Sequence, residues 1–198
     1  MTFSNDDPKH DRKSQKQKIR ADALKLRDTF EKNPYDPDLI AQRFLSLFED
    51  IKGKVISVYW PIKSEIDTSP LIEKLLKKGA TVALPVTGKR LEPLKFVKWD
   101  GVEPLQKSGF GTYAPKQTQD NTIIPNIIVL PLVAFDRYGT RLGYGQGHYD
   151  ITLDKFLAEG IDIKTVGYAY DQQICLFPLP KEDHDQKLDV ILTPTQTY

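Results

Sequence analysis

The chain has 198 residues, and its 28 Lys and Arg residues nearly balance its 27 Asp and Glu residues, which gives a formal net charge of +1. This balance excludes a strongly basic nucleic-acid-binding class, and a hydrophobic content of 39% excludes general disorder. The single cysteine, Cys175, excludes an internal disulfide and fits a reducing compartment. Because the N-terminus lacks an apolar signal-like segment and no run approaches ~18 apolar residues, we expect a cytoplasmic protein without a membrane or nucleic-acid partner.

The length favours one domain. We expect the polar residues 1–13 to form a flexible arm ahead of a single domain over residues 14–198. Apolar residues at helical spacing predict a first helix over 14–31. A second helix is predicted from an N-cap at Asp36, with Pro37 at its first position, to about residue 50. The residues expected to face inward are Ile19, Ala23, Leu26 and Phe30 in the first helix and Leu39, Ile40, Phe44, Leu47 and Phe48 in the second.

Short β-rich runs then alternate with helical segments. Strands are predicted over 54–60 and 81–84, on either side of a helix over 69–78, and the short crossover predicts parallel pairing. The apolar run 127–130 is typical of a strand that is covered on both faces. This order predicts an α/β fold with three layers, a mainly parallel sheet flanked by helices. The remaining predicted elements are strands over 94–99, 165–170 and 189–192 and a helix over 148–159, and the polar stretch 100–122 receives no assignment.

A glycine-rich segment over 135–150 follows the 127–130 strand and opens a predicted helix. Glycines allow backbone N–H groups to approach phosphate oxygens, and the N-terminus of the following helix adds a positive dipole. The spacing Gly143-x-Gly145-x-Gly147 differs from a dinucleotide-binding fingerprint, because His148 stands where its third glycine would be, and no P-loop motif is present. The spacing alone therefore leaves two interpretations open: a phosphate-binding loop, or a turn that serves close strand–helix packing.

Several segments, in order along the chain, resemble the 5-formyltetrahydrofolate cyclo-ligase family. They are Lys16-Gln-Lys-Ile-Arg20, Trp60-Pro-Ile-Lys-Ser-Glu-Ile-Asp-Thr68, the long stretch Pro131–Asp136 and Arg141–Asp150, Val166–Gln173, and His184-Asp185 with Leu188-Asp189. The resemblance runs from about residue 16 to 193. The sequence departs from the family's usual residues at Ala114, His148 and Ile151. The resemblance implies a three-layer fold of the NagB/RpiA/CoA-transferase type.

The resemblance also implies an enzyme that uses ATP and Mg²⁺ and acts on small molecules. In the implied reaction, the γ-phosphoryl group of ATP is transferred to the formyl oxygen of 5-formyltetrahydrofolate. N10 then attacks the activated carbon, the ring closes and phosphate leaves, giving 5,10-methenyltetrahydrofolate. Such chemistry needs positioning and charge neutralisation more than covalent catalysis by the protein. We expect a monomer or weak homodimer.

The resemblance assigns residues to each part of this site. Arg141 and Tyr149 are the catalytic candidates, and Asp150 and Asp189 are the candidate Mg²⁺ ligands. Trp60 and Glu65, together with Gly147, His148 and Tyr149, are the candidates for folate binding, where an aromatic ring covers the pterin and a carboxylate accepts its N–H groups. The ATP-binding candidates are Lys16, Arg20, Arg141, Leu142, Gly143, Tyr144, Gly145, Gln146, Gly147, His148 and Tyr149.

Each candidate also has a purely structural interpretation. Lys16 and Arg20 share a helix face but belong to a segment crowded with cations, which favours a solvated charge run. Arg141 fits a loop salt bridge, Asp150 a first-turn helix acid, and Asp189 a strand-edge charge. Trp60 fits rim packing, and Glu65 fits a charge ahead of the 69–78 helix. Asp136 is a further carboxylate near the loop, and Cys175 fits a small buried hydrophobe.

Other function classes remain alternatives to the cyclo-ligase. The departures at Ala114 and His148 leave room for a non-catalytic protein that binds reduced folate or nucleotide on the same fold. A sugar-phosphate isomerase or acyl-transfer relative is a second alternative, because glycine-rich α/β sheets serve many chemistries. The absence of a fitting nucleophile or base motif argues against it. A nucleic-acid-binding arm over 9–27 is disfavoured by the balanced charge.

Overall fold

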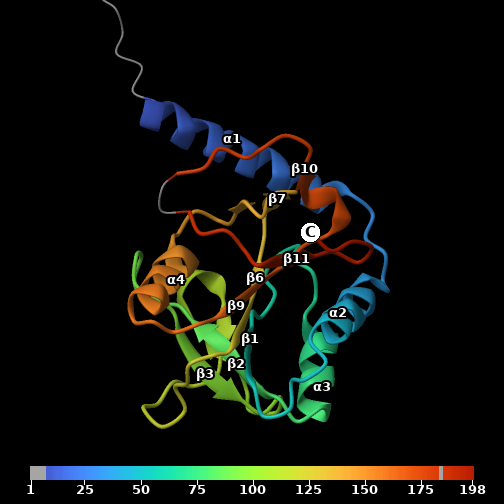
Figure 1. The fold of residues 1–198 in the computed structure, drawn as a ribbon, viewed down its shortest axis with the longest axis vertical. Coiled ribbons are helices and arrows are strands. Elements are labelled where there is room, and N and C mark those ends of the chain that lie inside the picture. The colour runs from blue at the N-terminus through green and yellow to red at the C-terminus, as the bar shows by residue number, and fades with distance from the viewer. Residues whose placement is uncertain (1–7, 183–184) are drawn as a thin grey trace, which may run out of the picture.

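The computed structural model describes residues 8–182 and 185–198, in which a six-stranded sheet forms the centre of the molecule (Figure 1). The strand order is β11-β9-β6-β1-β2-β3, and all neighbours pair in parallel except β2 and β3. The predicted parallel pairing of the first two strands is confirmed, with Val55 opposite Thr81. The strands are β1 (Val55–Val58), β2 (Thr81–Val86), β3 (Lys95–Trp99), β6 (Ile127–Pro131), β9 (Lys164–Tyr168) and β11 (Val190–Leu192).

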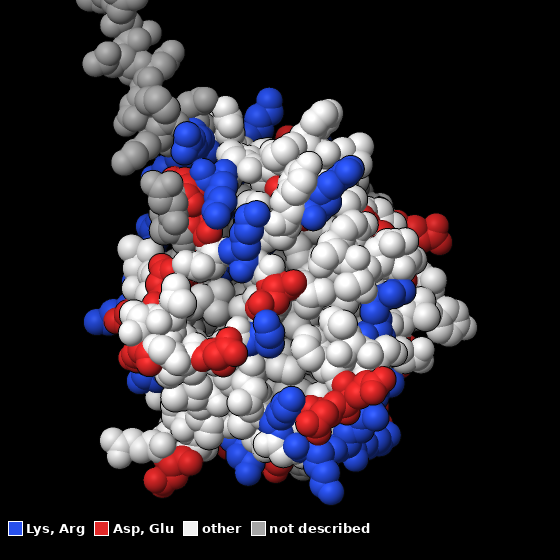
Figure 2. Space-filling view, viewed as in Figure 1, with Lys and Arg blue, Asp and Glu red and all other residues white. Residues whose placement is uncertain are grey.

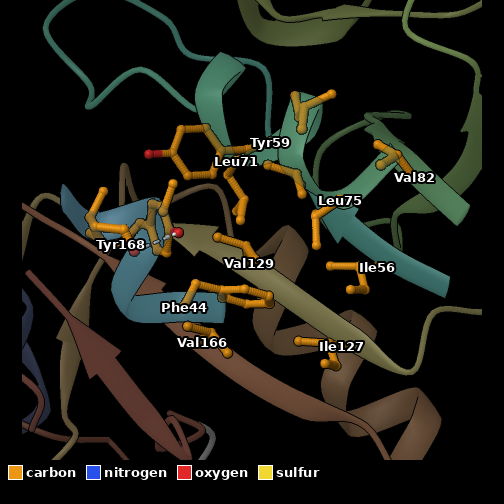
Figure 3. Close-up of a cluster of buried hydrophobic side chains, with 14 of the residues drawn as sticks. Phe44, Ile56, Tyr59, Leu71, Leu75, Val82, Ile127, Val129, Val166 and Tyr168 are labelled. Atoms are coloured by element: carbon orange, nitrogen blue, oxygen red, sulfur yellow. Dashed lines mark hydrogen bonds between the residues drawn. The ribbon is translucent and has the colours of Figure 1, made fainter. Parts of the chain in front are cut away.

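Helices cover both faces of this sheet. Helices α2 (Asp36–Leu47) and α3 (Ser69–Lys77) pack on one face, and α4 (His148–Ala158) packs on the other. Alternate residues of each strand point to opposite layers, as in β6, where Ile127 and Val129 join the α2 and α3 side and Ile128 and Leu130 join the α4 side. Figure 3 shows Phe44 of α2 against Val129 and Val166 in the first of these cores. The predicted three-layer α/β fold is therefore confirmed.

Helix α1 (Pro8–Thr29) lies outside these layers. It packs on a small sheet of order β10-β7-β8, built from β7 (Ala134–Asp136), β8 (Arg141–Leu142) and β10 (Ile174–Cys175). Ile19 and Ala23 contact the buried Ala134 and Leu142 of this sheet. Figure 1 shows α1 running across the top of the molecule, beside β7 and β10. The first helix thereby brings its inward face to the carboxyl end of β6.

The buried carboxylate of Asp136 fixes the β7–β8 turn. One oxygen accepts hydrogen bonds from the backbone N–H groups of Tyr138 (2.9 Å) and Thr140 (3.0 Å), and the other accepts one from the N–H of Leu179 (2.9 Å). Because all of these bonds serve the backbone, Asp136 is a structural residue rather than a spare acid at the site.

Three sequence predictions for the helices need correction. Helix α1 begins at Pro8, so residues 8–13 of the predicted arm are helical. Because Lys, Arg and Gln are good helix formers, a helix can extend into polar sequence that has no apolar stripe. Residues 1–7 lie outside the described residues. Tyr35, not Asp36, is the N-cap of α2, which ends at Leu47. Leu26, Leu39 and Leu47, expected to face inward, are 50%, 40% and 48% exposed.

The unassigned stretch 100–122 forms a small two-stranded sheet that packs beside β2 and β3. Within it, strands β4 (Gln106–Lys107) and β5 (Tyr113–Ala114) flank a 3₁₀ turn, η1 (Gly109–Gly111). Elsewhere in the chain, a second 3₁₀ turn, η2 (Asp171–Gln173), precedes β10. Ala114, a departure from the family pattern, is buried. Within the described part of the chain, no helix is both long enough and apolar enough to cross a bilayer.

Candidate active site

The glycine segment lies between β8 and α4. Gly145 and Gly147 have φ values of 84° and 76°, a region that side-chain-bearing residues rarely adopt, and Gly147 is the N-cap of α4. Leu142 is buried beneath the loop in β8, whereas Gly143, Tyr144 and Gln146 are partly exposed. The loop therefore ends at a helix N-terminus whose first N–H groups have no intrahelical partner, which is the arrangement that binds anions.

Arg20 of α1 reaches this loop, whereas Lys16 of the same helix is held by two carboxylates. The Nε of Arg20 donates a hydrogen bond to the carbonyl oxygen of Gly143, 2.6 Å away, and the Arg20 guanidinium lies against Gly145. Lys16 is buried, and its Nζ lies 2.5 Å from a carboxylate oxygen of Glu182 and 2.5 Å from one of Asp185. Figure 2 shows Lys and Arg side chains over α1 with acidic side chains beside them. The alternative interpretation of this segment as a solvated charge run is therefore wrong for Lys16.

Arg141 and Asp150 form an ion pair beside the loop. The Nη2 of Arg141 lies 2.7 Å from Oδ1 of Asp150, and its Nη1 donates to the backbone carbonyl of Gln186. The Arg141 side chain is 7% exposed and that of Asp150 is 29% exposed. A partly exposed carboxylate in the first turn of α4 fits a Mg²⁺ ion that takes its other ligands from phosphate oxygens and water.

Asp189 lies at a different place in the fold. Its Oδ2 accepts hydrogen bonds from the backbone N–H (2.8 Å) and the hydroxyl (2.7 Å) of Thr165, and its Oδ1 pairs with Lys164 (3.1 Å). These groups stand at the amino ends of β9 and β11, whereas the glycine loop lies beyond the carboxyl ends of the strands. Burial raises the pKa of Asp189, but the bonds from Thr165 and Lys164 outweigh it, so the net shift is downward.

The folate half of the predicted site follows β1. Glu65 accepts a hydrogen bond from the backbone N–H of Ile62 at 2.8 Å, and the hydroxyl of Tyr144 lies close enough to its carboxyl to lower the pKa. Burial raises the pKa of Glu65 to about 7, against the opposing effects of the Ile62 bond, Arg27, Tyr144 and Lys63. The loop after β1 and the glycine loop therefore meet at the Glu65 carboxyl.

Aromatic and imidazole groups line the same region. Trp60 is partly buried and packs edge-on against Trp99, with ring centroids 5.5 Å apart. Burial, and next the charge of Glu65, raise the pKa of Tyr149, which remains a neutral hydroxyl at physiological pH. His148 is buried, its Nδ1 lies 2.9 Å from the carbonyl oxygen of Glu92, and its ring packs edge-on against Phe110.

The fold and the order of these segments can now be compared with known proteins. The sequence profile of the 5-formyltetrahydrofolate cyclo-ligase family matches residues 12–194. The chain belongs to this family. A 5-formyltetrahydrofolate cyclo-ligase of Haemophilus influenzae is 34% identical over 188 residues, covering 89% of this chain and 96% of the relative. One of Escherichia coli is 32% identical over 167 residues, covering 80% and 87%.

Solved structures agree with the cyclo-ligase family assignment. The structure of Aquifex aeolicus 5,10-methenyltetrahydrofolate synthetase superposes with a TM-score of 0.75 at 27% identity, covering 92% of this chain and 91% of that one. The structure of the Mycoplasma pneumoniae 5,10-methenyltetrahydrofolate synthetase has a TM-score of 0.69 at 22% identity and shows that the fold is shared. The family's enzymatic function thus favours the ligase over the non-catalytic alternative.

The structure of this cyclo-ligase family member brings most of the predicted site residues together, but not all. Arg20 contacts the glycine loop directly, Arg141 pairs with Asp150, and Glu65 meets Tyr144. Lys16 points to the carboxylates that follow residue 180, and Asp189 holds the amino ends of two strands. Among the described residues, no cluster of three or more His, Cys, Asp or Glu side chains is arranged to hold a metal ion. His184 of the predicted motifs lies outside the described residues.

Sequence analysis missed one buried cation of this cyclo-ligase site. Arg27 is 1% exposed, and its Nη2 donates to the hydroxyl of Tyr144. The signal was present, since Arg20 and Arg27 are separated by seven residues and so share the helix face of Lys16. Because several other Lys and Arg residues lie in the same segment, the sequence did not distinguish Arg27 from the exposed cations.

Proposed function

We propose that this protein converts 5-formyltetrahydrofolate and ATP into 5,10-methenyltetrahydrofolate, ADP and phosphate. The observation that carries the proposal is the meeting of the glycine loop with the loop after β1, where Arg27 donates hydrogen bonds to both Tyr144 and Ser64. An anion-binding helix N-terminus and the half-buried carboxyl of Glu65 thereby become neighbours. A phosphate donor at one and a pterin at the other would have their reacting groups side by side.

The proposed reaction has two steps. A formyl oxygen of the folate forms a bond to the γ-phosphorus of ATP, the bond from that phosphorus to the β-bridging oxygen breaks, and ADP leaves. The N10 lone pair then attacks the formyl carbon, its proton is lost, and the carbon–oxygen bond breaks with release of phosphate. Charge neutralisation and orientation are the protein's contribution, because phosphoryl transfer needs little covalent chemistry from side chains.

We assign the ATP phosphates to the loop 143–149 and its cations. Arg20 and Arg141 lie at the loop, and Lys16 becomes available when phosphate oxygens replace Glu182 and Asp185 as its partners. Arg141 and Tyr149 stand where charge would develop during transfer. When bound, Mg²⁺ would neutralise charge on the phosphates. We assign the ion to Asp150 and not to Asp189, because both carboxylate oxygens of Asp189 already accept hydrogen bonds within the fold.

We assign the pterin to Glu65 and Trp60. The Glu65 carboxylate accepts N–H groups of the ring, and the partly exposed indole of Trp60 covers an apolar edge. His148 and Tyr149 complete the junction between the two substrates. We further propose that the protein works in the cytoplasm as a monomer or weak homodimer, without nucleic acid or membrane, and light scattering after size exclusion tests the oligomeric state.

An absorbance assay for methenyltetrahydrofolate tests the proposal. Product should form from 5-formyltetrahydrofolate only when ATP and Mg²⁺ are present, with one ADP per product. Glu65→Gln should raise the KM for the folate and leave the KM for ATP near its wild-type value, because Glu65 lies on the folate side of Tyr144. The proposal is wrong if micromolar protein gives no ATP-dependent product while calorimetry shows tight folate binding.

A further inference from the structure

We propose that Arg27 is a positioning residue that acts through the Tyr144 hydroxyl to hold the Glu65 carboxylate in place and ionised. The proposal rests on the function proposed above, because it concerns the residue that binds the pterin. Arg27 does not touch Glu65 through any hydrogen bond in the described structure, and Tyr144 stands between them.

The Arg27 guanidinium joins three segments that are far apart in the sequence. Its Nη1 donates to the carbonyl oxygen of Leu132 at the end of β6 (3.1 Å), its Nε donates to Ser64 Oγ (3.1 Å), and its Nη2 donates to Tyr144. Ser64 is the neighbour of Glu65 and donates in turn to Asp28. The rigid guanidinium fork therefore fixes both the loop that carries Glu65 and the loop that carries Tyr144.

Tyr144 lies between Arg27 and Glu65. Its hydroxyl oxygen accepts the hydrogen bond from Arg27 Nη2, which leaves the hydroxyl proton to point toward the Glu65 carboxylate beside it. The Arg27 guanidinium also lies 5.6 Å from the centroid of the Tyr144 ring, which adds a cation–π contact. The Glu65 carboxylate thus has the Tyr144 hydroxyl beside it and the positive charge of Arg27 behind that hydroxyl.

The other charged or titratable groups that face Glu65 come from three elements. Lys63 lies in the same loop, is exposed, and sits 5.4 Å from the Tyr144 ring. Tyr59 at the end of β1 is buried and Tyr149 of α4 is partly buried, and burial raises the pKa of each, so both are uncharged. Solvent screens Lys63 more than it screens the buried Arg27. Arg27 is therefore the one buried cation in the described structure among the groups that face Glu65.

A merely structural role for Arg27 makes a different prediction. A buried arginine that only ties α1 to β6 would affect stability and leave the titration of Glu65 unchanged. Burial already brings the pKa of Glu65 to about 7, so a further rise would leave the carboxyl protonated under physiological conditions. A protonated Glu65 loses an acceptor for the pterin N–H groups. The titration of Glu65 therefore separates the two roles.

The test titrates Glu65 directly in the intact protein. The carboxyl carbon is followed by NMR in wild type, Arg27→Gln and Tyr144→Phe, with assignment from Glu65→Gln. We expect both variants to raise the Glu65 pKa by about one unit or more, the shift that loss of a nearby opposite charge or hydrogen bond produces. The acid limb of kcat/KM for the folate should move upward by the same amount, so that activity lost at pH 7 returns at pH 9.

Arg43→Gln is the matched control. Arg43 of α2 also reaches a distant segment, donating to the carbonyl oxygens of Pro194 (3.3 Å) and Thr195 (2.9 Å), away from the site. Its removal should lower stability without moving the Glu65 titration. The proposal is overturned if Arg27→Gln or Tyr144→Phe folds and Glu65 titrates as in wild type. If Arg27→Gln does not fold, Tyr144→Phe alone decides. If wild type lacks cyclo-ligase activity, the proposed function fails while the NMR titration still tests the role of Arg27.

Discussion

Arg20 of α1 donates from Nε to the carbonyl oxygen of Gly143 at 2.6 Å, so the first helix touches the glycine loop directly. This bond holds the guanidinium over Gly145, where a Cβ atom would lie 3.2 Å from the Arg20 Cζ. The absence of a side chain at Gly145 therefore makes room for the Arg20 guanidinium.

Gly145→Ala should raise the KM for ATP by about tenfold or more, because small displacements of positioning groups carry large kinetic costs. The added methyl group pushes Arg20 away, and the φ of 84° adds strain. Gly53→Ala is the control, since Gly53 has a φ of 75° but no atom within 4 Å of the added Cβ. Steady-state kinetics and thermal unfolding separate the effects. Equal kinetic losses in both variants would refute the Arg20 contact as the cause.

Lys16→Gln should lower the free energy of unfolding by about 3 kcal/mol, the cost of removing one partner from a buried ion pair. Glu182 and Asp185, with side chains 28% and 17% exposed, would be left to repel each other. Lys77→Gln removes an exposed i,i+4 pair with Glu73 and should lower the free energy of unfolding far less. Urea unfolding measures both, and similar values would contradict the expected burial of Lys16.

The free energy of unfolding should depend on pH through Glu65. Its folded pKa of about 7 lies above the ordinary value of 4.5, so the folded state binds the proton more tightly. Stability attributable to this group is present at low pH and is lost as pH rises from about 4.5 to 7. Relative to Glu65→Gln, wild type should lose up to about 3 kcal/mol over this window. Unfolding at pH 5 and pH 8 measures the difference, and exposed Glu49→Gln should show the wild-type slope.

Asp150→Asn and Asp189→Asn should affect different properties. Asp150→Asn should raise the Mg²⁺ concentration for half-maximal activity by about tenfold or more, since even loss of an outer-shell partner costs that much. Asp189→Asn should lower stability, because an amide nitrogen would face the donors of Thr165, and should leave the Mg²⁺ dependence unchanged. A Mg²⁺ titration with thermal unfolding of each variant checks this. A shifted Mg²⁺ dependence in Asp189→Asn would return Asp189 to the metal site.

Local sequence patterns predicted the parts of this fold that depend on continuous burial. The apolar run at β6 and the β1–α3–β2 unit were predicted because their side chains meet the core within a few residues. Leu26 and Arg27 show where such patterns fail. Both lie on α1, yet Leu26 is half-exposed and Arg27 is buried, because Leu132 and Tyr144 are brought to that face only by the tertiary fold. Burial of a charge depends on partners that no local window contains.

The site residues divide in the same way. The glycine loop, Arg141 and Glu65 stand in segments that resemble the family's motifs, and it was this resemblance that placed them in one site. Asp189 carries a suitable side chain, but its position relative to Asp150 depends on which end of β11 it occupies. Asp189 lies far from the glycine loop because it precedes β11, at the amino end of the strand, and not because of its residue type.

The placement of α1 has a consequence for the order in which the protein folds. Lys16 is 169 residues from Asp185 along the chain, Arg20 is 123 from Gly143, and Arg27 is 105 from Leu132. Such contacts carry the largest loop-closure cost and form after the local strand–helix units. During synthesis the first helix therefore waits for partners made near the end of translation. The contacts between α1 and the glycine loop would then be among the last to form.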